Sequence, residues 1–247
     1  MIRIFVGYEP KEALAYHVLC HSILDNASEP VSICPVNLKN LKFDRPRDPL
    51  QSTEFSFSRF LVPYLCDFRG HAIFMDCDML CRGDIAELWA MRDSVPVQVV
   101  KHDYTPSTGV KFLGNTQTQY AKKNWSSVML FNNHLCQTLG FNRVKTALGL
   151  WLHQFQWASE IGELPPEWNY LVGEEQPAID PKLVHFTLGG PWFKEYEECE
   201  YANEWREAGL SVIDNGQDRQ HHEDPGLPSW DETPPTKVRK DRTNRKM

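Results

Sequence analysis

The sequence predicts an α/β fold with a central, mostly parallel sheet flanked by helices. The chain opens with a predicted strand (Ile2–Val6), a helix (Glu9–Ser22) and a second strand (Val31–Val36), the order typical of parallel strands joined by a crossover helix. A short apolar run, Ala72–Met75, then leads straight into acidic residues, as expected of a strand buried on both faces. With 247 residues, 41% of them hydrophobic, the chain can bury a sizeable core.

Later segments continue the alternation of helices and strands. Thr53–Leu65 is predicted as a helix that a hydroxyl side chain caps and that Pro63 kinks or ends. Asp84 is expected to cap another helix. The other predicted elements are strands at Val95–Val100, Trp125–Phe131 and Leu183–His185 and a helix at Phe141–Leu152.

The C-terminal part differs in composition from the rest. From residue 215 the sequence is polar and contains prolines, so we expect a folded domain over residues 1–214 and a flexible tail over 215–247. Residues 237–247 hold six basic residues and one acidic residue, a charge of +5, and the rest of the chain carries −12. An acidic body disfavours nucleic-acid binding. For the basic end two hypotheses stay open, namely peripheral contact with anionic membrane lipid and a solvated end.

The seven cysteines indicate a reducing compartment rather than a disulfide framework. No Cys-x-x-Cys pair occurs, and a zinc site at Cys77 and Cys81 would lack a second pair of ligands. The N-terminus does not have the layout of a secretory signal, and no apolar run approaches the roughly 18 residues of a membrane span. We therefore expect a cytoplasmic protein, at most peripheral to the inner face of the membrane.

The acidic pair Asp76 and Asp78 stands at the carboxyl end of the strand predicted at 72–75, the edge at which ligands bind in open α/β sheets. Where the chain bends, two carboxylates one residue apart can approach one cation. Hard divalent ions such as Mg²⁺ or Mn²⁺ bind carboxylate oxygens together with substrate phosphates. The pair therefore favours a metal–diphosphate site, and the alternative is an acidic turn that caps a helix.

Arg59 and His185 each have a functional and a structural interpretation. Arg59 lies in the helix predicted before the acidic strand, where it would contact a phosphate or, alternatively, extend from the core to solvent. His185 precedes a glycine loop, Gly189-Gly190, whose amides can approach an oxygen-rich ligand. Imidazole suits Mn²⁺ tolerably, so His185 is a candidate ligand, and the alternative is a structural histidine. The segment 101–104 is expected to line the site or to form a polar loop.

Four segments, in the same order, resemble the family 8-like glycosyltransferases of the GT-A fold. These are retaining sugar-nucleotide enzymes such as glycogenin and bacterial lipooligosaccharide galactosyltransferases. The segments are IRIFVGY at 2–8, FSRFLVPYL at 57–65, FMDCDML at 74–80 and HFTLGGPW at 185–192. The resemblance thus runs from the opening strand to about Trp192 and implies a GT-A fold for residues 1–214.

The resemblance also implies an activity and a set of site residues. It implies transfer of a sugar, with retention, from a nucleotide sugar (a UDP-sugar as first candidate) to a saccharide or glycolipid acceptor. Asp76, Asp78 and His185 would hold Mn²⁺ or Mg²⁺. The catalytic set would be Arg59, Asp76 and Asp78, and the nucleotide-binding set Val6, Gly7, Tyr8, Arg59, Asp76, Cys77, Asp78, Gly189 and Gly190.

The chain departs from the family pattern at three places. One is Trp125-Ser126-Ser127, where the family's small-residue strand begins with Asn-Ala-Gly. Gly190 stands where the family has a lysine that neutralises the diphosphate. The family's Asp-Gln pair before the Trp-Asn segment, here Trp168-Asn169, has Ser159-Glu160 as its nearest candidate. A catalytically inactive sugar-nucleotide-binding protein is therefore the first alternative function. A haloacid-dehalogenase-type phosphatase, which also places Asp-x-Asp after an apolar strand, is the second.

Overall fold

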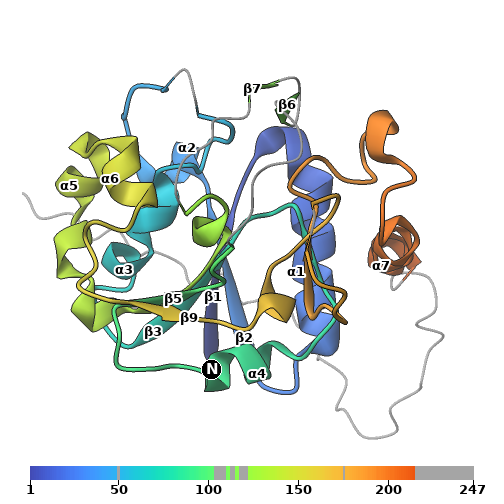
Figure 1. Ribbon diagram of the computed structural model, residues 1–247, viewed down its shortest axis with the longest axis horizontal. Helices are drawn as coiled ribbons and strands as arrows, with labels where there is room; N and C mark the ends of the chain where they lie inside the picture. The colour runs from blue at the N-terminus through green and yellow to red at the C-terminus, as the bar shows by residue number, and fades with distance from the viewer. Residues whose placement is uncertain (49–50, 103–109, 112–114, 117–121, 175, 215–247) are drawn as a thin grey trace, which may run out of the picture.

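A six-stranded sheet forms the centre of the computed structural model, which describes residues 1–48, 51–102, 110–111, 115–116, 122–174 and 176–214 (Figure 1). Its strand order is β2-β1-β3-β8-β5-β9. The strands are β1 (Ile2–Gly7), β2 (Val31–Val36), β3 (His71–Met75), β5 (Val97–Val99), β8 (Val128–Asn132) and β9 (Ile161–Glu163). The strands β2, β1 and β3 run parallel, as do β5 and β9, whereas β8 is antiparallel to both of its neighbours. The mostly parallel sheet is confirmed, with β8 reversed.

The first crossover is confirmed, although its helix, predicted over Glu9–Ser22, lies at Ala13–Asn26. α1 (Ala13–Asn26) joins the parallel strands β1 and β2. The 3₁₀ turn η1 (Pro10–Glu12) leads into it, because proline suits a first turn, where the backbone N–H has no helical partner. Both β1 and β3 are buried along nearly their whole length, which explains their uninterrupted apolar sequences.

A second sheet, β10-β11-β4, joins the C-terminal part of the domain to the acidic motif. Its strands are β4 (Met79–Cys81), β10 (Tyr170–Leu171) and β11 (Leu183–His185). β11 is antiparallel to β4, and His185 lies opposite Met79. The strand predicted to end at His185 is confirmed, and its register brings the histidine beside the residue that follows Asp78.

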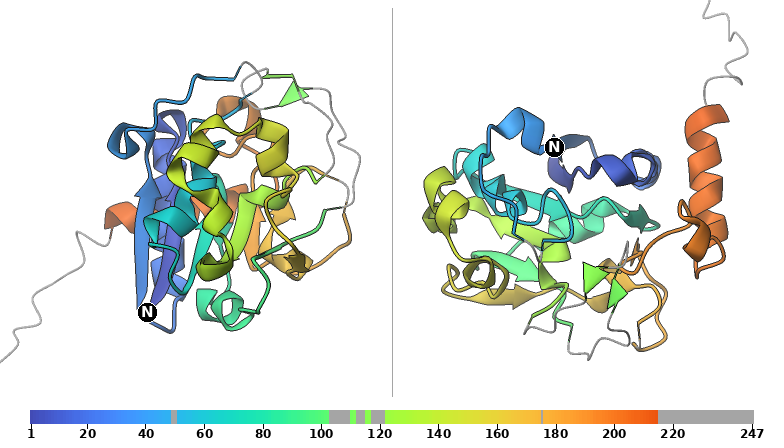
Figure 2. Two further views of the ribbon diagram at one scale, coloured as in Figure 1. Left: turned by 90° about the vertical axis from the view of Figure 1, so that its left-hand side faces the viewer. Right: turned by 90° about the horizontal axis from the view of Figure 1, so that it is seen from above.

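The other elements are short. They are α2 (Leu38–Leu41), α3 (Val62–Leu65), α4 (Ile85–Ala90), α5 (Phe141–Thr146), α6 (Gly149–His153), α7 (Ala202–Asp214), β6 (Val110–Lys111) and β7 (Asn115–Thr116). Asp84 caps α4 as predicted, because its side chain accepts a hydrogen bond from Ala86 N–H at 2.9 Å. α5 and α6 lie at one end of the molecule and α1 and α7 at the other, where Val18 and Trp205 share a small apolar cluster (Figure 2).

The helix predicted over 53–65 is wrong in its first half. Turns occupy its beginning, followed by the 3₁₀ helix η2 (Ser58–Leu61) and then α3. The Ser56 hydroxyl group donates to Thr53 O at 2.8 Å, so side-chain hydrogen bonding competes with the helix. Pro63 does not kink a helix, because it lies in the first turn of α3.

Two other segments differ from their predictions in extent. The helix predicted over 141–152 is divided, because Ala147 and Leu148 are extended between α5 and α6. The strand predicted to begin at Trp125 begins at Val128, after the 3₁₀ turn η4 (Trp125–Ser127). This turn lies at the edge of the sheet where the acidic motif is found.

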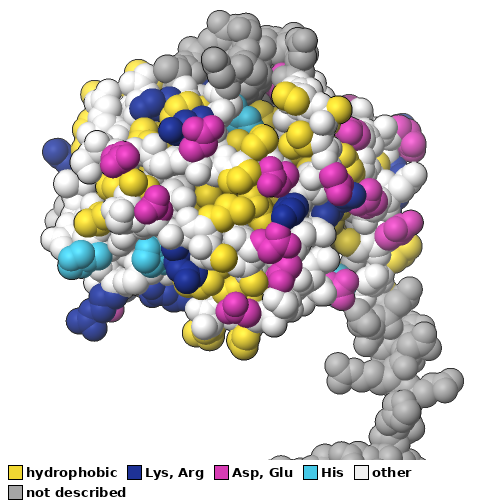
Figure 3. Space-filling model, turned by 60° about the horizontal axis from the view of Figure 1, so that its bottom comes forward, with side chains coloured by type: hydrophobic (Ala, Val, Ile, Leu, Met, Phe, Trp, Pro, Cys, Tyr) yellow, Lys and Arg dark blue, Asp and Glu magenta, His cyan; other side chains and the backbone are white. Residues whose placement is uncertain are grey.

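No helix among the described residues is long and apolar enough to cross a membrane. Acidic, basic and apolar side chains are interspersed over the face shown in Figure 3. The predicted tail, 215–247, lies outside the described residues, so its flexibility and its contact with lipid stay predictions.

Gly7, the last residue of β1, packs closely against the buried ring of Phe55, and a substitution there tests this packing. A Cβ atom on Gly7 would lie 2.4 Å from Phe55 Cδ2, and Phe55 is almost fully buried. We expect Gly7→Ala to lower the free energy of unfolding by about 1–3 kcal/mol through overpacking, measured by urea denaturation. Gly209→Ala in α7 is the control, because its Cβ would make an ordinary contact with Val18 at 3.5 Å. That control should stabilise the helix by about 0.5–1 kcal/mol. A Gly7→Ala protein as stable as the wild type would contradict the packing.

Candidate functional site

Asp76 and Asp78 lie on either side of the bend that links β3 to β4. Asp76 N–H donates a hydrogen bond to Ser127 O at 3.0 Å, and Phe186 N–H donates to Asp78 O at 2.9 Å. The turn before β8 therefore fixes one end of the motif, and the residue after β11 fixes the other. Segments that are distant in the sequence thus fix the backbone from which both carboxylates project.

The structure brings together the three predicted metal ligands. One donor atom from each of Asp76, Asp78 and His185 lies within 4.8 Å of the other two. His185 Nε2 is 3.5 Å from Asp78 Oδ2, and the histidine ring is 2% exposed. Two carboxylates and one imidazole form a donor set suited to Mn²⁺, and the group fits such an ion in composition and spacing. Among the described residues, no other group of histidine, cysteine and acidic side chains has this spacing.

Asn169 fixes the protonation of the His185 ring. Asn169 Nδ2 donates to Asn124 O at 3.1 Å, so its Oδ1 must be the atom that faces His185 Nδ1 at 2.9 Å. Nδ1 therefore carries a proton, and Nε2, which lies 3.5 Å from Asp78 Oδ2, is the ring nitrogen available to a metal ion. This is the tautomer that a metal-binding histidine needs, and an amide partner for the other ring nitrogen is a common support of such sites.

Arg59 is buried, so the alternative in which its side chain extends from the core to solvent is wrong. Arg59 Nη1 lies 2.8 Å from Asp76 Oδ1 and donates to Ser126 O at 2.9 Å. The guanidinium carbon is 5.1 Å from the centre of the Phe55 ring and 5.2 Å from that of Phe74. These contacts orient the Asp76 carboxylate, and direct contact with a donor phosphate stays a prediction.

A cavity of about 570 Å³ opens beside the metal group. The described lining residues are Glu12, Asp48, Gln51, Ser52, Thr53, Ser56, Phe57, Arg59, Asp76, Asp78, Asn124, Ser126, Ser127, Gly149, Leu150, His153, Gln154, His185 and Thr187.

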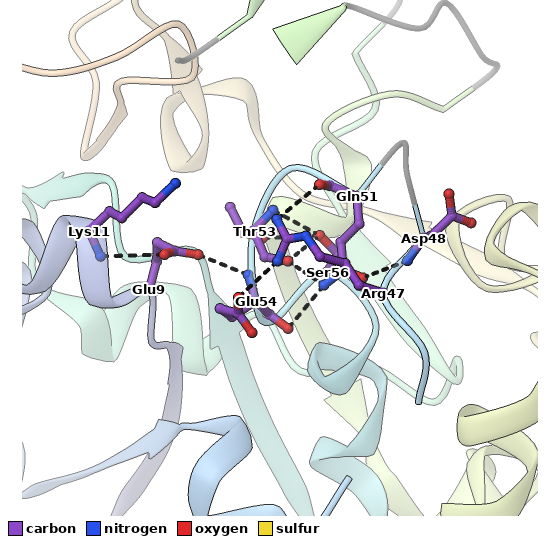
Figure 4. Close-up of polar contacts among 8 residues, drawn as sticks. All are labelled: Glu9, Lys11, Arg47, Asp48, Gln51, Thr53, Glu54 and Ser56. Carbon is purple, nitrogen blue, oxygen red and sulfur yellow. Dashed lines mark hydrogen bonds and ion pairs between the residues drawn. The ribbon is translucent and has the colours of Figure 1, made fainter. Parts of the chain in front are cut away.

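One wall of the cavity is formed by Asp48, residues 51–53 and Ser56, and a polar network connects the described residues on and around this wall (Figure 4). Glu9 Oε2 accepts a hydrogen bond from Glu54 N–H at 2.9 Å, and Glu9 Oε1 accepts one from Lys11 N–H at 3.3 Å. Arg47 Nη1 pairs with Glu54 Oε1 at 2.8 Å. The buried Glu9 carboxylate thereby ties the wall to the first turn after β1.

Glu12 is a site residue that the sequence did not reveal. It is 3% exposed and lines the cavity next to the acidic motif. Burial, followed by the charges of Asp78, Glu9 and Asp76, raises the pKa of Glu12 to about 9. The carboxyl group is therefore neutral near pH 7 when no cation is bound. Nothing in the local pattern signals this, because a glutamate at the start of a helix is ordinarily solvated.

His153 and Gln154 also line the cavity, whereas Ser159 and Glu160, predicted as the nearest match to the family's Asp-Gln pair, line a separate hollow. His153 Nδ1 lies 3.0 Å from the Ser126 hydroxyl group. His153 and Gln154 both follow from the second of the two short helices, since His153 ends α6 and Gln154 is its C-cap residue. Ser159 and Glu160 are not among the described residues that line the cavity, and their match to the family's pair stays a prediction.

The predicted nucleotide-binding residues of β1 lie at its carboxyl end. Val6 is buried in the sheet, and Tyr8 N–H donates to Val36 O at 3.2 Å. The Tyr8 ring packs edge-on against Tyr16 at 5.3 Å. Val6, Gly7 and Tyr8 are not among the described residues that line the cavity, so their contact with a base stays a prediction.

The glycine loop makes internal contacts. Gly189 N–H donates to Phe186 O at 2.9 Å, and Gly189 adopts φ 134°. A Cβ atom on Gly190 would lie 2.1 Å from the Trp192 ring. Both glycines are therefore required by packing or backbone conformation, and their predicted contact with a diphosphate stays a prediction.

The segment at 101–104 is only partly described. Lys101 Nζ lies 3.6 Å from Glu163 Oε2. Burial, followed by the charge of His185, lowers the pKa of His102 to about 4, so this ring is neutral beside the metal group. Asp103 and Tyr104 lie outside the described residues.

Cysteine takes no part in the metal group. Cys77 is fully buried, and its thiol lies 3.8 Å from Glu12 Oε2. Burial raises the pKa of the Cys77 thiol well above its usual range. The Cys81 thiol donates to Gly83 O at 3.2 Å. All seven cysteines are free thiols, and the structure gives no support to a zinc site at Cys77 and Cys81.

Comparison with known proteins supplies the family. No protein-family model matches the chain. Protein CDI of Arabidopsis thaliana is 46% identical over 217 residues, which cover 82% of this chain and 84% of that protein. The chain belongs to the family of protein CDI. The name of this relative states no activity.

Solved structures with the same fold are glycosyltransferases. An active-site mutant of LgtC has a TM-score of 0.56 at 10% identity, covering 85% of this chain and 96% of that one. GlyE of Streptococcus pneumoniae has a TM-score of 0.57 at 14% identity over 87% of this chain and 63% of that one. The bifunctional glycosyltransferase WbbM has a TM-score of 0.54 at 14% identity. The match to WbbM covers 84% of this chain but only 49% of WbbM. The GT-A fold is confirmed, and this leaves the dehalogenase-type phosphatase without support.

The raised pKa of Glu12 predicts a pH dependence of stability. In the unfolded chain this carboxyl group has its ordinary pKa of 4.5, and in the folded chain its pKa is about 9. At a pH between these two values the folded state therefore holds a proton that the unfolded state has lost. Stability should fall as pH rises from 5 to 8, and Glu12→Gln should remove this loss. The free energy of unfolding of Glu12→Gln, relative to that of the wild type, should therefore increase by up to about 4 kcal/mol between pH 5 and pH 8. Urea denaturation at pH 5 and pH 8, with a chelator present, measures this difference. The same difference between variant and wild type at both pH values would contradict the raised pKa of Glu12.

The role of Asn169 predicts a difference between two substitutions. Asn169→Leu removes the acceptor for His185 Nδ1–H and should weaken Mn²⁺ binding about 10–100-fold, measured by isothermal titration calorimetry. Asn169→Asp keeps an acceptor oxygen and should bind Mn²⁺ nearly as the wild type does. Both variants lose the hydrogen bond to Asn124 O, so that loss is matched. Equal weakening in the two variants would contradict control of the tautomer by this residue.

Proposed function

We propose that the chain is a metal-dependent glycosyltransferase that takes a sugar from a nucleotide sugar and transfers it with retention of anomeric configuration. A UDP-sugar is the first candidate donor, and a saccharide or glycolipid is the acceptor. The observation that carries the proposal is the group Asp76, Asp78 and His185 at the wall of a 570 Å³ cavity, on a GT-A fold. Further support is a crystal structure of LgtC, a protein with the same fold, in complex with donor and acceptor sugar analogs.

The chemistry follows from the leaving group, a nucleoside diphosphate that gains negative charge as the glycosidic bond breaks. Mn²⁺ or Mg²⁺, when bound, would supply electrostatic and Lewis-acid stabilisation of that charge. Asp76, Asp78 and His185 would hold the ion. Arg59 keeps the Asp76 carboxylate turned toward it through their 2.8 Å contact.

The attack on the anomeric carbon is proposed to occur on the face from which the diphosphate departs. Four acidic residues line the described part of the cavity, and Asp76 and Asp78 are assigned to the ion. Neither of the other two, Glu12 and Asp48, is assigned as a covalent nucleophile, and burial raises the pKa of Glu12. A front-face displacement, in which the leaving phosphate takes the proton of the acceptor hydroxyl group, requires no covalent enzyme intermediate.

A catalytically inactive sugar-nucleotide-binding protein is the second candidate. One observation favours it, since Gly190 replaces the family's lysine and the neighbouring Gly189 N–H already donates to Phe186 O at 2.9 Å. That loop, as folded, offers no side-chain cation to the diphosphate. The two candidates differ in turnover but not in binding.

A nucleotide-sugar screen with and without Mn²⁺ tests the proposal. A ligand that binds the folded state raises the melting temperature, so UDP-sugars should raise it only when Mn²⁺ is present. Asp78→Asn and His185→Ala should abolish this joint effect and the slow hydrolysis of the UDP-sugar. Asp180→Asn, which removes a carboxylate that is 93% exposed, is the control and should behave as the wild type does. Mn²⁺-dependent binding without hydrolysis would favour the inactive binding protein. Full activity of Asp78→Asn would contradict the assignment of Asp78 as a metal ligand.

A further inference from the structure

Glu12 lies at the junction between β1 and α1, on the cavity side. In open α/β sheets, ligands bind outside the carboxyl ends of the strands, and β1 ends five residues before Glu12. The side chain is 3% exposed and lines the cavity, next to Asp76 and Asp78. Glu12 therefore lies where a nucleotide donor would be bound.

The described structure gives Glu12 little compensation for its burial. Among the described residues, the one side-chain hydrogen bond of Glu12 joins Oε2 to the Cys77 thiol at 3.8 Å, and a thiol is a weak donor. The side chain does not cap α1, although Glu12 occupies the N-cap position. No arginine or lysine among the described residues pairs with it. A buried carboxyl group with so little support destabilises the fold, so a purely structural role explains it poorly.

Direct metal ligation does not account for Glu12 either. The close group comprises Asp76, Asp78 and His185, and Glu12 is not part of it. Glu9, three residues earlier, provides a comparison within the same turn. Its oxygens accept hydrogen bonds from Lys11 N–H and Glu54 N–H, so its role in the scaffold is evident. Glu12 has no equivalent function in the scaffold.

We propose that Glu12 is a specificity-determining residue that accepts hydrogen bonds from hydroxyl groups of the bound donor. Carboxyl oxygens match hydroxyl donors such as those of a ribose or hexose ring, and nucleotide-binding sites of α/β proteins use an acidic residue in this way. The hydroxyl groups belong to the ribose or to the transferred sugar, and both present the same chemistry to Glu12. The inference rests on the proposed function, because it requires a nucleotide-sugar donor in this cavity.

Titration calorimetry with a set of variants and ligands tests the proposal. The proteins are the wild type, Glu12→Ala, Glu12→Gln and Glu9→Gln, and the ligands are UDP, 2′-deoxy-UDP and UDP-glucose, each with Mn²⁺. If the ribose is the partner, the wild type should bind UDP about tenfold or more tightly than 2′-deoxy-UDP, and Glu12→Ala should bind both alike. If the transferred sugar is the partner, Glu12→Ala should instead lose the affinity that glucose adds to UDP.

Two control variants distinguish the loss of a hydroxyl contact from a general disturbance of the turn that holds Glu12. Glu12→Gln keeps an acceptor oxygen at nearly the same volume and should retain part of the discrimination. Glu9→Gln disturbs the same turn but not the hydroxyl contact, so it should preserve the ratio of affinities found in the wild type, whatever its effect on their absolute values.

The outcomes distinguish the two proposals. If the wild type binds none of the three ligands, the nucleotide-sugar function fails, and the role of Glu12 fails with it. If the wild type binds them and Glu12→Ala keeps the same ratios, only the role of Glu12 is overturned. Loss of Mn²⁺ binding in Glu12→Ala, measured with the metal alone, would also overturn it by making Glu12 part of the metal site.

Discussion

The buried ion pair between Arg59 and Asp76 connects the parts of the site. Removing two charges from water costs several kcal/mol each, and the pair persists because other groups share that cost. Arg59 also donates to Ser126 O at 2.9 Å and lies beside two aromatic rings, those of Phe55 and Phe74. The pair joins η2, the end of β3 and the turn before β8. Loss of one partner would leave a buried charge exposed to the apolar core, so the orientation of Asp76 depends on Arg59.

The cavity has an excess of acidic groups around that pair. Among the described lining residues, Arg59 is the one arginine or lysine, against Glu12, Asp48, Asp76 and Asp78. Glu12 relieves part of the repulsion by staying protonated, which is what its raised pKa expresses. A bound divalent cation would relieve the rest. The same charge distribution that makes the ion-free site unfavourable thus favours a cation and, through it, a diphosphate.

Much of the fold could be predicted from local signals. The strands at the N-terminus and at 71–75 follow from short apolar runs, and Asp84 caps α4 because an N-cap needs only the neighbouring N–H groups. Prediction failed where side chains compete with the backbone or where packing interrupts a helix. The Ser56 hydroxyl group bonds Thr53 O, and Ala147 is extended between two short helices. These outcomes depend on contacts that helical periodicity does not contain.

The sequence by itself determined the α/β class, the position of the acidic pair at a strand end and the candidacy of His185 as a third ligand. Only the tertiary structure decided that these groups meet. Antiparallel pairing of β11 with β4 places His185 opposite Met79, and Asn169 selects the tautomer of the ring. It also decided that Glu12 is a buried carboxyl group rather than a solvated one, with its pKa raised to about 9. The physical reason is that hydrogen-bond register, burial and charge proximity are set by residues that lie far apart in the chain.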